Sequence, residues 1–408
     1  MSPLAERRVS CCIAGGGPAG MLAGYLLSRA GVDVLVLEKH ADFLRDFRGD
    51  TIHPSTLAVI DELGLLEQFL RLPHQKAEQL SGRIGETVLE LADFRHLPVK
   101  SRFIVLMPQW DFLNFFAEQG RGFRGFSLLM EAEATGLVEE DGRVVGLQAA
   151  TPNGPLEIRA DLVLGADGRH STVREAANLH RKTLGAPMDV LWFRLARQDS
   201  DPNETFGRIN AGAILILINR LTYWQCGFVI AKGSVETLRA AGIAAFQARL
   251  ATFAPFLANR AQQIDAWDKV SLLSVAVDRL ERWYRSGLLC IGDAAHAMSP
   301  IGGVGINLAV QDAVAAANIL ALPLREHRLT EANLAAVQRR REFPTRATQR
   351  LQVFLQNRVI SRVLGTDQPI VAPAALRLLA AIPPLRRIPA RVIGMGFRPE
   401  HVRLPPMP

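Results

Sequence analysis

The chain has 408 residues, of which 49% are hydrophobic and 21% charged; this composition is typical of a globular protein with a large core and argues against a mostly disordered chain. The formal net charge is +7, with arginine runs at 339–341 and 386–387, which indicate a solvated face or an anionic ligand. No zinc-ligand pattern or RNA-binding motif accompanies this charge, so nucleic acid is not an expected partner.

The four cysteines form no C-x-x-C pair and show no metal-binding spacing. Cys11, Cys12 and Cys290 lie in apolar, strand-like runs, which predicts buried free thiols and suits a reducing cytoplasm. The N-terminal apolar run breaks into glycines too early for a signal peptide. No uninterrupted apolar run reaches ~18 residues, so no transmembrane helix is expected; residues 304–324, which include Asn307, are predicted to form a buried or amphipathic helix.

The N-terminal pattern is a strand, a glycine-rich turn, a helix and a second strand. The first strand is expected over residues 8–14 and the helix over 21–30, ending at Gly31. Residues 32–38 are almost entirely apolar, as in a strand that is covered on both faces. This order is the βαβ unit that opens a dinucleotide-binding fold.

Further elements follow in chain order. A helix is expected from Ser55, as its N-cap, to Leu70, with an interruption at Gly64. Turn signals at Asp141-Gly142 and Asn153-Gly154 predict a meander of strands. The pattern also predicts strands over 82–91, 103–107, 190–195, 214–218, 224–230, 272–277 and 288–291, helices over 111–119 and 235–253, and a mostly helical chain after Gly305.

The glycine-rich turn reads Gly15-Gly16-Gly17-Pro18-Ala19-Gly20 and fits G-x-G-x-x-G. In this motif the first glycine allows the tight turn, the second lets a pyrophosphate approach the backbone, and the third lets the helix pack against the strand. The helix N-terminus offers N–H groups to the phosphates. Glu38 ends the second strand, where its carboxylate can accept hydrogen bonds from a ribose and disfavours a 2′-phosphate. The motif by itself does not separate FAD from NAD.

Two later segments carry a resemblance that favours FAD. They are LVLGADGRHSTVR at 162–174 and LLCIGDAAHAMSPIGGVGINLAVQD at 288–312. Together with the first motif, and in the same order, they resemble the motifs of the flavin hydroxylases typified by p-hydroxybenzoate hydroxylase. The resemblance implies an α/β fold: a Rossmann-like FAD-binding domain (1–80, 100–180 and 280–330), an inserted mixed β-sheet substrate domain (81–99 and 181–279) and a C-terminal helical segment (331–408).

The resemblance also implies roles for residues in the two segments. Asp293 is expected to contact the ribityl or phosphate part of FAD, with a plain helix N-cap as the alternative. The loop from Pro300, with Gly303, Gly305, Ile306 and Asn307, is expected to lie beside the isoalloxazine ring, where the following helix dipole favours the negative charge of reduced flavin. His296 is expected to be structural.

Other residues are expected to support FAD or NAD(P)H. Asp167 and Arg174 are expected to order the site, with the Arg174 guanidinium forming a charge-assisted, two-point hydrogen bond to Asp167 or to a phosphate. A structural turn is the alternative. Arg48, with Arg45 as its rival, and Gln109 resemble an arginine and a glutamine that contact FAD in this family. Lys39, next to Glu38, is also a candidate cofactor contact.

The implied reaction is hydroxylation of an apolar, aromatic or polycyclic small molecule by O2 and NADPH or NADH, through a C4a-hydroperoxyflavin. No catalytic side chain or metal is needed, because the flavin carries the chemistry. The apolar stretch at 189–230, including Trp192, Phe193, Phe206, Trp224 and Phe228, is a candidate lid. Three alternatives stay open: a reductase of the geranylgeranyl-reductase type, a flavin halogenase, although no W-x-W-x-I-P stretch occurs, and a non-catalytic FAD-binding or membrane-surface protein.

Overall fold

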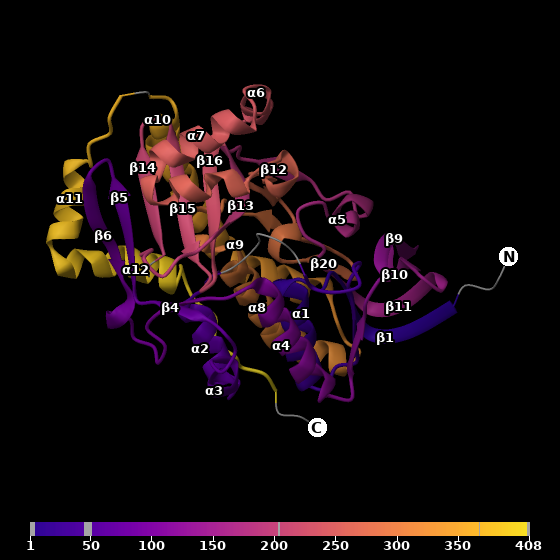
Figure 1. The fold of residues 1–408 in the computed structure, drawn as a ribbon. Coiled ribbons are helices and arrows are strands. Elements are labelled where there is room, and N and C mark those ends of the chain that lie inside the picture. The colour runs from indigo at the N-terminus through magenta and orange to yellow at the C-terminus, as the bar shows by residue number, and fades with distance from the viewer. Residues whose placement is uncertain (1–4, 45–50, 203–204, 367, 406–408) are drawn as a thin grey trace.

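The first of two large sheets is mostly parallel and is assembled from distant parts of the chain. The computed structural model describes residues 5–44, 51–202, 205–366 and 368–405. The main path of this sheet is β19-β20-β11-β1-β2-β8, and β10 and β9 extend it from β11 (Figure 1). Its strands are β1 (Ala5–Ala14), β2 (Val34–Leu37), β8 (Phe126–Leu129), β9 (Glu133–Glu140), β10 (Arg143–Thr151), β11 (Gly154–Gly165), β19 (Tyr284–Arg285) and β20 (Leu288–Cys290).

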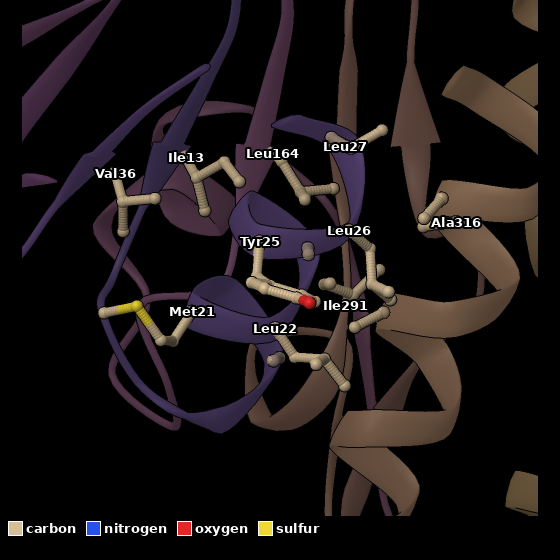
Figure 2. Packing of buried hydrophobic residues seen from close by; sticks show 14 of the residues in the cluster. Ile13, Met21, Leu22, Tyr25, Leu26, Leu27, Val36, Leu164, Ile291 and Ala316 are labelled. Atoms are coloured by element: carbon tan, nitrogen blue, oxygen red, sulfur yellow. The ribbon is translucent and has the colours of Figure 1, made fainter. Parts of the chain in front are cut away.

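Helix α1 (Pro18–Arg29) is packed between this sheet and two further helices, α4 (Gln109–Arg121) and α8 (Gly305–Arg325). Its side chains Met21, Leu22 and Leu26 are buried, and Figure 2 shows them among residues of β1, β11 and α8. Tyr25 meets the ring of Phe116 edge-on at 5.4 Å. This apolar packing on all sides fixes the start of α1, and therefore the glycine-rich turn, against the carboxyl end of β1.

Helix α8 corresponds to the helix predicted over residues 304–324, and of the two predicted forms, buried or amphipathic, it is the buried one. Within the residues that the structure describes, one helical stretch, Ile301–Arg325, is long and apolar enough to cross a membrane, and 83% of its apolar window is buried in the protein. Burial against α1 explains its composition.

The second large sheet is mixed and has the order β17-β13-β16-β15-β14-β5-β6, with β14 and β5 parallel. One face is covered by α6 (Val235–Ala240), α7 (Ile243–Phe253) and the 3-10 segments η2 (Pro255–Gln263) and η3 (Trp267–Lys269), with Phe193, Phe228 and Phe246 in its core. Its strands are β5 (Gln79–Ile84), β6 (Thr87–Asp93), β13 (Met188–Ala196), β14 (Phe206–Asn210), β15 (Ala213–Asn219), β16 (Tyr223–Ala231) and β17 (Ser271–Ser274).

Two three-stranded sheets and several short helices connect the large sheets. One small sheet has the order β3-β7-β4 and the other β12-β18-β21. The elements are β3 (Thr51–Ile52), β4 (Gln75–Ala77), β7 (Ile104–Leu106), β12 (Arg181–Thr183), β18 (Asp278–Leu280), β21 (His296–Ala297), α2 (Pro54–Glu62), α3 (Leu66–Phe69), α5 (Thr172–Ala176), η1 (Phe94–His96), η4 (Gly292–Ala294) and η5 (Ile301–Gly303).

The C-terminal helices run back across the molecule. Helix α9 (Glu331–Leu355) packs on α8 and continues through a π-helical turn (Gln356–Ile360) into α10 (Ser361–Leu364). Helices α11 (Ala374–Ala381) and α12 (Arg387–Gly394), joined by the 3-10 turn η7 (Pro383–Arg386), lie against β6 at the left of Figure 1. The last described residues return to α2, where the backbone N–H of Val402 donates to Glu62 at 2.8 Å.

Four local predictions are wrong. The N-cap of α2 is His53 and not Ser55, because Pro54 takes the first helical position, which its fixed φ favours. Residues 82–91 belong to a hairpin that turns at Gly85 (φ +56°). The helix predicted over 235–253 is two helices, because Gly242 has a φ of +87°. The strand at 272–277 ends at Ser274.

Candidate functional site

The glycine-rich turn forms an open cradle at the end of β1. Gly15 has a φ of +102°, and a Cβ there would lie 2.4 Å from the carbonyl oxygen of Ala166. A Cβ on Gly20 would lie 2.0 Å from the carbonyl oxygen of Gly15. At Gly17, by contrast, a Cβ would meet nothing within 4 Å. The space left over Gly17, at the N-terminus of α1, fits a pyrophosphate.

Pro18 and Ala19 complete this cradle from the first turn of α1. Pro18 stands at the start of the helix, where no intrahelical N–H bond is needed. Ala19 is a small residue at a crossing point, since a Cβ on Gly292 would lie 2.9 Å from the Cβ of Ala19. The close approach brings the Gly292-Asp293 turn directly onto the start of α1.

Glu38 lies directly after β2 and beside the glycine-rich turn. Its carboxylate accepts hydrogen bonds from the backbone N–H of Gly16 at 3.2 Å and of His40 at 3.1 Å. The contact fixes the acid next to the cradle, where the predicted ribose contact would form. Lys39 is more than half exposed and its Nζ lies 3.8 Å from Glu133, so the ammonium points toward β9; its contact with a cofactor stays a prediction.

Asp293 lies on η4, just after β20, and pairs with an arginine. The Nε of Arg169 donates to its carboxylate at 3.1 Å, and both side chains are about one-third exposed. The residue that precedes η4 is Ile291, so Asp293 is not the helix N-cap that was the alternative. Arg169, which follows the Asp-Gly pair directly, was not among the site residues predicted from the sequence.

The Asp-Gly segment is held by Asp167 and Arg174, each in its own way. Asp167 accepts from Ser171 Oγ at 2.5 Å and from the N–H of Val173 at 3.1 Å, so it stabilises the start of α5. Burial raises the pKa of Asp167, and these hydrogen bonds oppose the rise. The buried guanidinium of Arg174 donates to the carbonyls of Ala294 at 3.1 Å and Arg169 at 2.7 Å.

Arg174 therefore ties the Asp-Gly segment to the Gly-Asp segment through backbone carbonyls. The sequence suggested a two-point hydrogen bond from Arg174 to the Asp167 carboxylate. The guanidinium instead donates to these two carbonyls, which satisfy its N–H groups in the buried interior. A contact of either side chain with a cofactor stays a prediction.

The loop before α8 is a tight turn with two left-handed glycines. Pro300 precedes η5, and Gly302 and Gly303 have φ values of +77° and +63°. Thr51 Oγ1 donates to the Gly303 carbonyl at 2.9 Å, and a Cβ on Gly303 would lie 2.4 Å from Thr51 Oγ1. The residues 300–305 are called the flavin loop below, after their predicted position.

The start of α8 is open in the same way as the start of α1. A Cβ on Gly305 would meet nothing within 4 Å. Ile306 is buried, and Asn307 accepts from the His53 N–H at 3.0 Å and from Thr56 Oγ1 at 2.7 Å. The Asn307 side chain thus joins α8 to α2. The first N–H groups of a long helix and its positive end suit an anionic edge of a ligand.

His53 precedes α2 at the contact between α2 and α8, and it is completely buried. Its Nδ1 donates to the carbonyl of Ile393 at 2.8 Å, which places the proton on Nδ1 because a carbonyl only accepts. Burial lowers the pKa of His53 to about 4, although the Ile393 contact acts in the opposite direction. The ring is therefore neutral near pH 7.

Two glutamines that were not predicted from the sequence support the flavin loop, one on α9 and one at the start of the π-helical turn that follows it. Gln352 accepts from the Ser299 N–H at 3.1 Å and donates to the carbonyls of Ser299 and Ile301, both at 3.0 Å. Gln356 donates to Ser299 Oγ at 2.8 Å. Two amides four residues apart form no recognisable motif, so no signal in the sequence marks them.

A buried charge network lies under the Gly-Asp segment. Asp312 accepts from the N–H of Gly292 at 3.0 Å, and His296 Nε2 lies 2.6 Å from it. Arg341 of α9 bonds Asp312 at 2.9 Å and Glu400 at 3.3 Å. His296 is thus structural in its contacts, as expected. Arg341 and Glu400 were not anticipated, because both lie far from the motifs in sequence.

Two predicted contacts are less defined. Gln109 is the first residue of α4 and is half-buried, and its contact with FAD stays a prediction. Arg48 and its rival Arg45 lie outside the described residues.

The predicted lid residues divide between the two faces of the second sheet. Phe193, Trp224 and Phe228 are completely buried in the core beneath α7. Phe206 packs against the same core. Trp192 lies on the other face, packed against a cluster that also includes Ile301 of the flavin loop.

Comparison with known proteins places this arrangement in one family. A family model described as FAD binding domain matches residues 8–351. The chain belongs to this family and is an FAD-dependent monooxygenase. The expected FAD cofactor, the oxidoreductase class and the aromatic hydroxylase fold are thereby confirmed.

Particular relatives agree with this class. The 6-methylpretetramide 4-monooxygenase of Streptomyces rimosus is 35% identical over 396 residues, which are 96% of this chain and 93% of the relative. The rifampicin monooxygenase of Streptomyces venezuelae is 27% identical over 74% of this chain, and the match spans 61% of that protein.

Solved structures share the fold. The p-nitrophenol 4-monooxygenase of Pseudomonas putida matches with a TM-score of 0.75 at 17% identity, over 95% of this chain and 97% of its own. A probable FAD-dependent monooxygenase from Pseudomonas aeruginosa matches with a TM-score of 0.72 at 21% identity, over 88% of this chain and 97% of its own.

Proposed function

We propose that this monooxygenase hydroxylates an apolar, polycyclic aromatic small molecule of the tetracycline-precursor type, with O2 and NADPH or NADH as co-substrates. The observation that carries the proposal is the 35% identity along nearly the whole length of a relative named 6-methylpretetramide 4-monooxygenase. A second relative, 25% identical, is named for 12-dehydrotetracycline and anhydrotetracycline, although the match spans only 61% of its length.

The chain's own residues fit FAD at two places where a Cβ would find open space, over Gly17 and over Gly305. Gly17 and the start of α1 would hold the pyrophosphate, Glu38 the ribose, and Asp293 with Arg169 the ribityl-phosphate part. The start of α8 would face the negative edge of the reduced ring. FAD held by these residues would supply the redox chemistry, in which two electrons come from NAD(P)H, one oxygen atom of O2 enters the substrate and the other leaves as water.

The substrate would lie between the flavin loop and the face of the second sheet that is opposite α7. Trp192 is half-buried there, and its ring lies against Gly227, where an added Cβ would come within 3.0 Å of it. A flat indole on an apolar sheet provides stacking for a polycyclic aromatic ring. Such a surface also excludes water, which protects the reacting oxygen from unproductive release as peroxide.

The first test is an absorbance spectrum, followed by NADPH and NADH oxidation with and without a tetracyclic phenol such as anhydrotetracycline. We expect two flavin bands and substrate-stimulated oxidation that needs O2, with one atom of 18O2 in the product. Trp192→Leu should raise KM for the tetracyclic phenol more than Trp267→Leu, a matched change in η3 on the α7 side of the sheet. Oxidation that is independent of O2 would instead favour a reductase, and halogen incorporation a halogenase.

A further inference from the structure

Helix α9 exposes the two phenylalanines that stand out from the rest of the described chain. Phe343 is 60% exposed and Phe354 58%, whereas the other phenylalanines that the structure describes are buried or half-buried. The two lie eleven residues apart, about three helical turns, so both project from the same side of α9. Exposed aromatic rings on one side of a helix are a common sign of an interaction surface.

Arginines accompany the two rings. Arg339, Arg350 and Arg358 are exposed and lie at positions that alternate with the phenylalanines along this side. Residues 331–408 contain thirteen arginines and four acidic residues, an excess of nine, while the whole chain has a net charge of only +7. The positive charge of the protein is therefore concentrated in its C-terminal part.

This side of α9 and the following turn, formed by Arg339, Phe343, Arg350, Phe354 and Arg358, is called the basic aromatic face. Its charge disfavours a second copy of the chain, because arginines would then meet arginines. The rings are about 16 Å apart along one helix. Two rings in a straight row of this length fit a flat surface better than they fit a single pocket in a protein partner.

We propose that the basic aromatic face docks on the surface of a bilayer that contains anionic phospholipid. The phenylalanine rings would enter the boundary between headgroups and acyl chains, and the arginines would reach the lipid phosphates. The other side of α9 holds the flavin loop through Gln352. Docking would thus bring the site close to a phase in which an apolar substrate concentrates.

The test uses the FAD-loaded full chain and sedimentation with vesicles. We expect binding to vesicles of phosphatidylcholine with phosphatidylglycerol, little binding to phosphatidylcholine alone, and a strong decrease at high salt. Arg339→Gln/Arg350→Gln/Arg358→Gln should weaken binding about a hundredfold, since each basic residue near such a surface contributes about a factor of five. Phe343→Ser/Phe354→Ser should weaken it about tenfold or more.

Matched controls use exposed residues elsewhere. Val88→Ser/Leu221→Ser removes two apolar side chains of similar exposure, 62% and 60%. Arg102→Gln/Arg121→Gln/Arg124→Gln removes three exposed arginines. Binding by the controls at the wild-type level supports the proposal. Equal losses in both sets, or no sedimentation of the wild type with anionic vesicles, would overturn it. Vesicle binding is measured without turnover, so this outcome is independent of the proposed substrate.

Discussion

The glycines of the site are of two kinds: at some an added Cβ would clash with the protein, and at others it would meet open space. A Cβ added at Gly15 or Gly20 would come within 2.4 Å of a backbone atom, so the fold itself requires glycine at both positions. Gly17 has no such neighbour. Packing therefore does not require a glycine at this position, and the predicted pyrophosphate contact offers a reason for it.

We expect Gly17→Ala to fold but to lose FAD. The added methyl group meets no protein atom, and the change at this helix N-cap costs at most about 1 kcal/mol of unfolding free energy. The same methyl group would occupy the pyrophosphate space, so FAD affinity should fall at least about tenfold, or about 1.4 kcal/mol. Flavin fluorescence titration of the apoprotein measures this. Gly207→Ala, also without neighbours within 4 Å but on β14, is the control; equal FAD affinities would contradict the prediction.

His53 gives the protein a pH-dependent stability. Its pKa is about 4 in the folded protein and about 6.5 when exposed, because burial opposes the charged ring. Between these values the unfolded chain binds more protons, so the unfolding free energy falls as the pH is lowered from 6.5 to 4, by about 3 kcal/mol from this group. Urea unfolding of wild type and His53→Gln at pH 7 and 4.5 measures this. Identical pH dependence in both proteins would show that His53 is not responsible.

Among the elements, the N-terminal βαβ unit and the meander were predictable. Their signals are local: apolar strands, glycine motifs and Asp-Gly or Asn-Gly turns, all of which keep their meaning in any fold. The breaks at Gly85 and Gly242 were missed, because a glycine in a periodic run indicates a turn only when its φ is positive. That angle is decided by where the neighbouring elements pack.

The candidate site could be predicted in part from these elements. Gly17 and the Gly-Asp turn follow from motifs, and the structure places them at the ends of β1 and β20, two strands on either side of β11. The second open glycine, Gly305, lies at the start of α8. The pairing of Arg169 with Asp293 and the support of the flavin loop by Gln352 were not predictable. Each joins segments more than fifty residues apart, and no local pattern records such a contact.

On the scale of the whole molecule, one buried charge network joins the FAD-binding core to the C-terminal chain. Asp312 bonds Gly292, His296 and Arg341, and Arg341 reaches Glu400. Burial alone would raise the pKa of Asp312, but His296 and Arg341 outweigh it and hold the pKa below its usual value. The carboxylate therefore stabilises the fold at neutral pH, and this contribution is lost only in acid, as the pH falls below about 4.

We expect Asp312→Asn to destabilise the whole molecule by about 3–5 kcal/mol at pH 7, because it leaves the Arg341 charge buried and without its anion. The urea midpoint of the FAD-loaded protein is the measurement. Asp268→Asn, an exposed change on η3, should shift the unfolding free energy by about 0.5 kcal/mol or less. A small effect at Asp312 would mean that the network relaxes or admits water.

The sequence by itself determined the dinucleotide-binding start, the order of its motifs and the family, because these depend on neighbours a few residues apart. It also indicated that Cys11, Cys12 and Cys290 are buried thiols, as the structure shows. Only the tertiary structure decided which face of the second sheet looks toward the flavin loop, which helix holds that loop, and where the arginines of α9 meet solvent. These features depend on contacts between distant segments, and their free energy exists only once the segments have packed together.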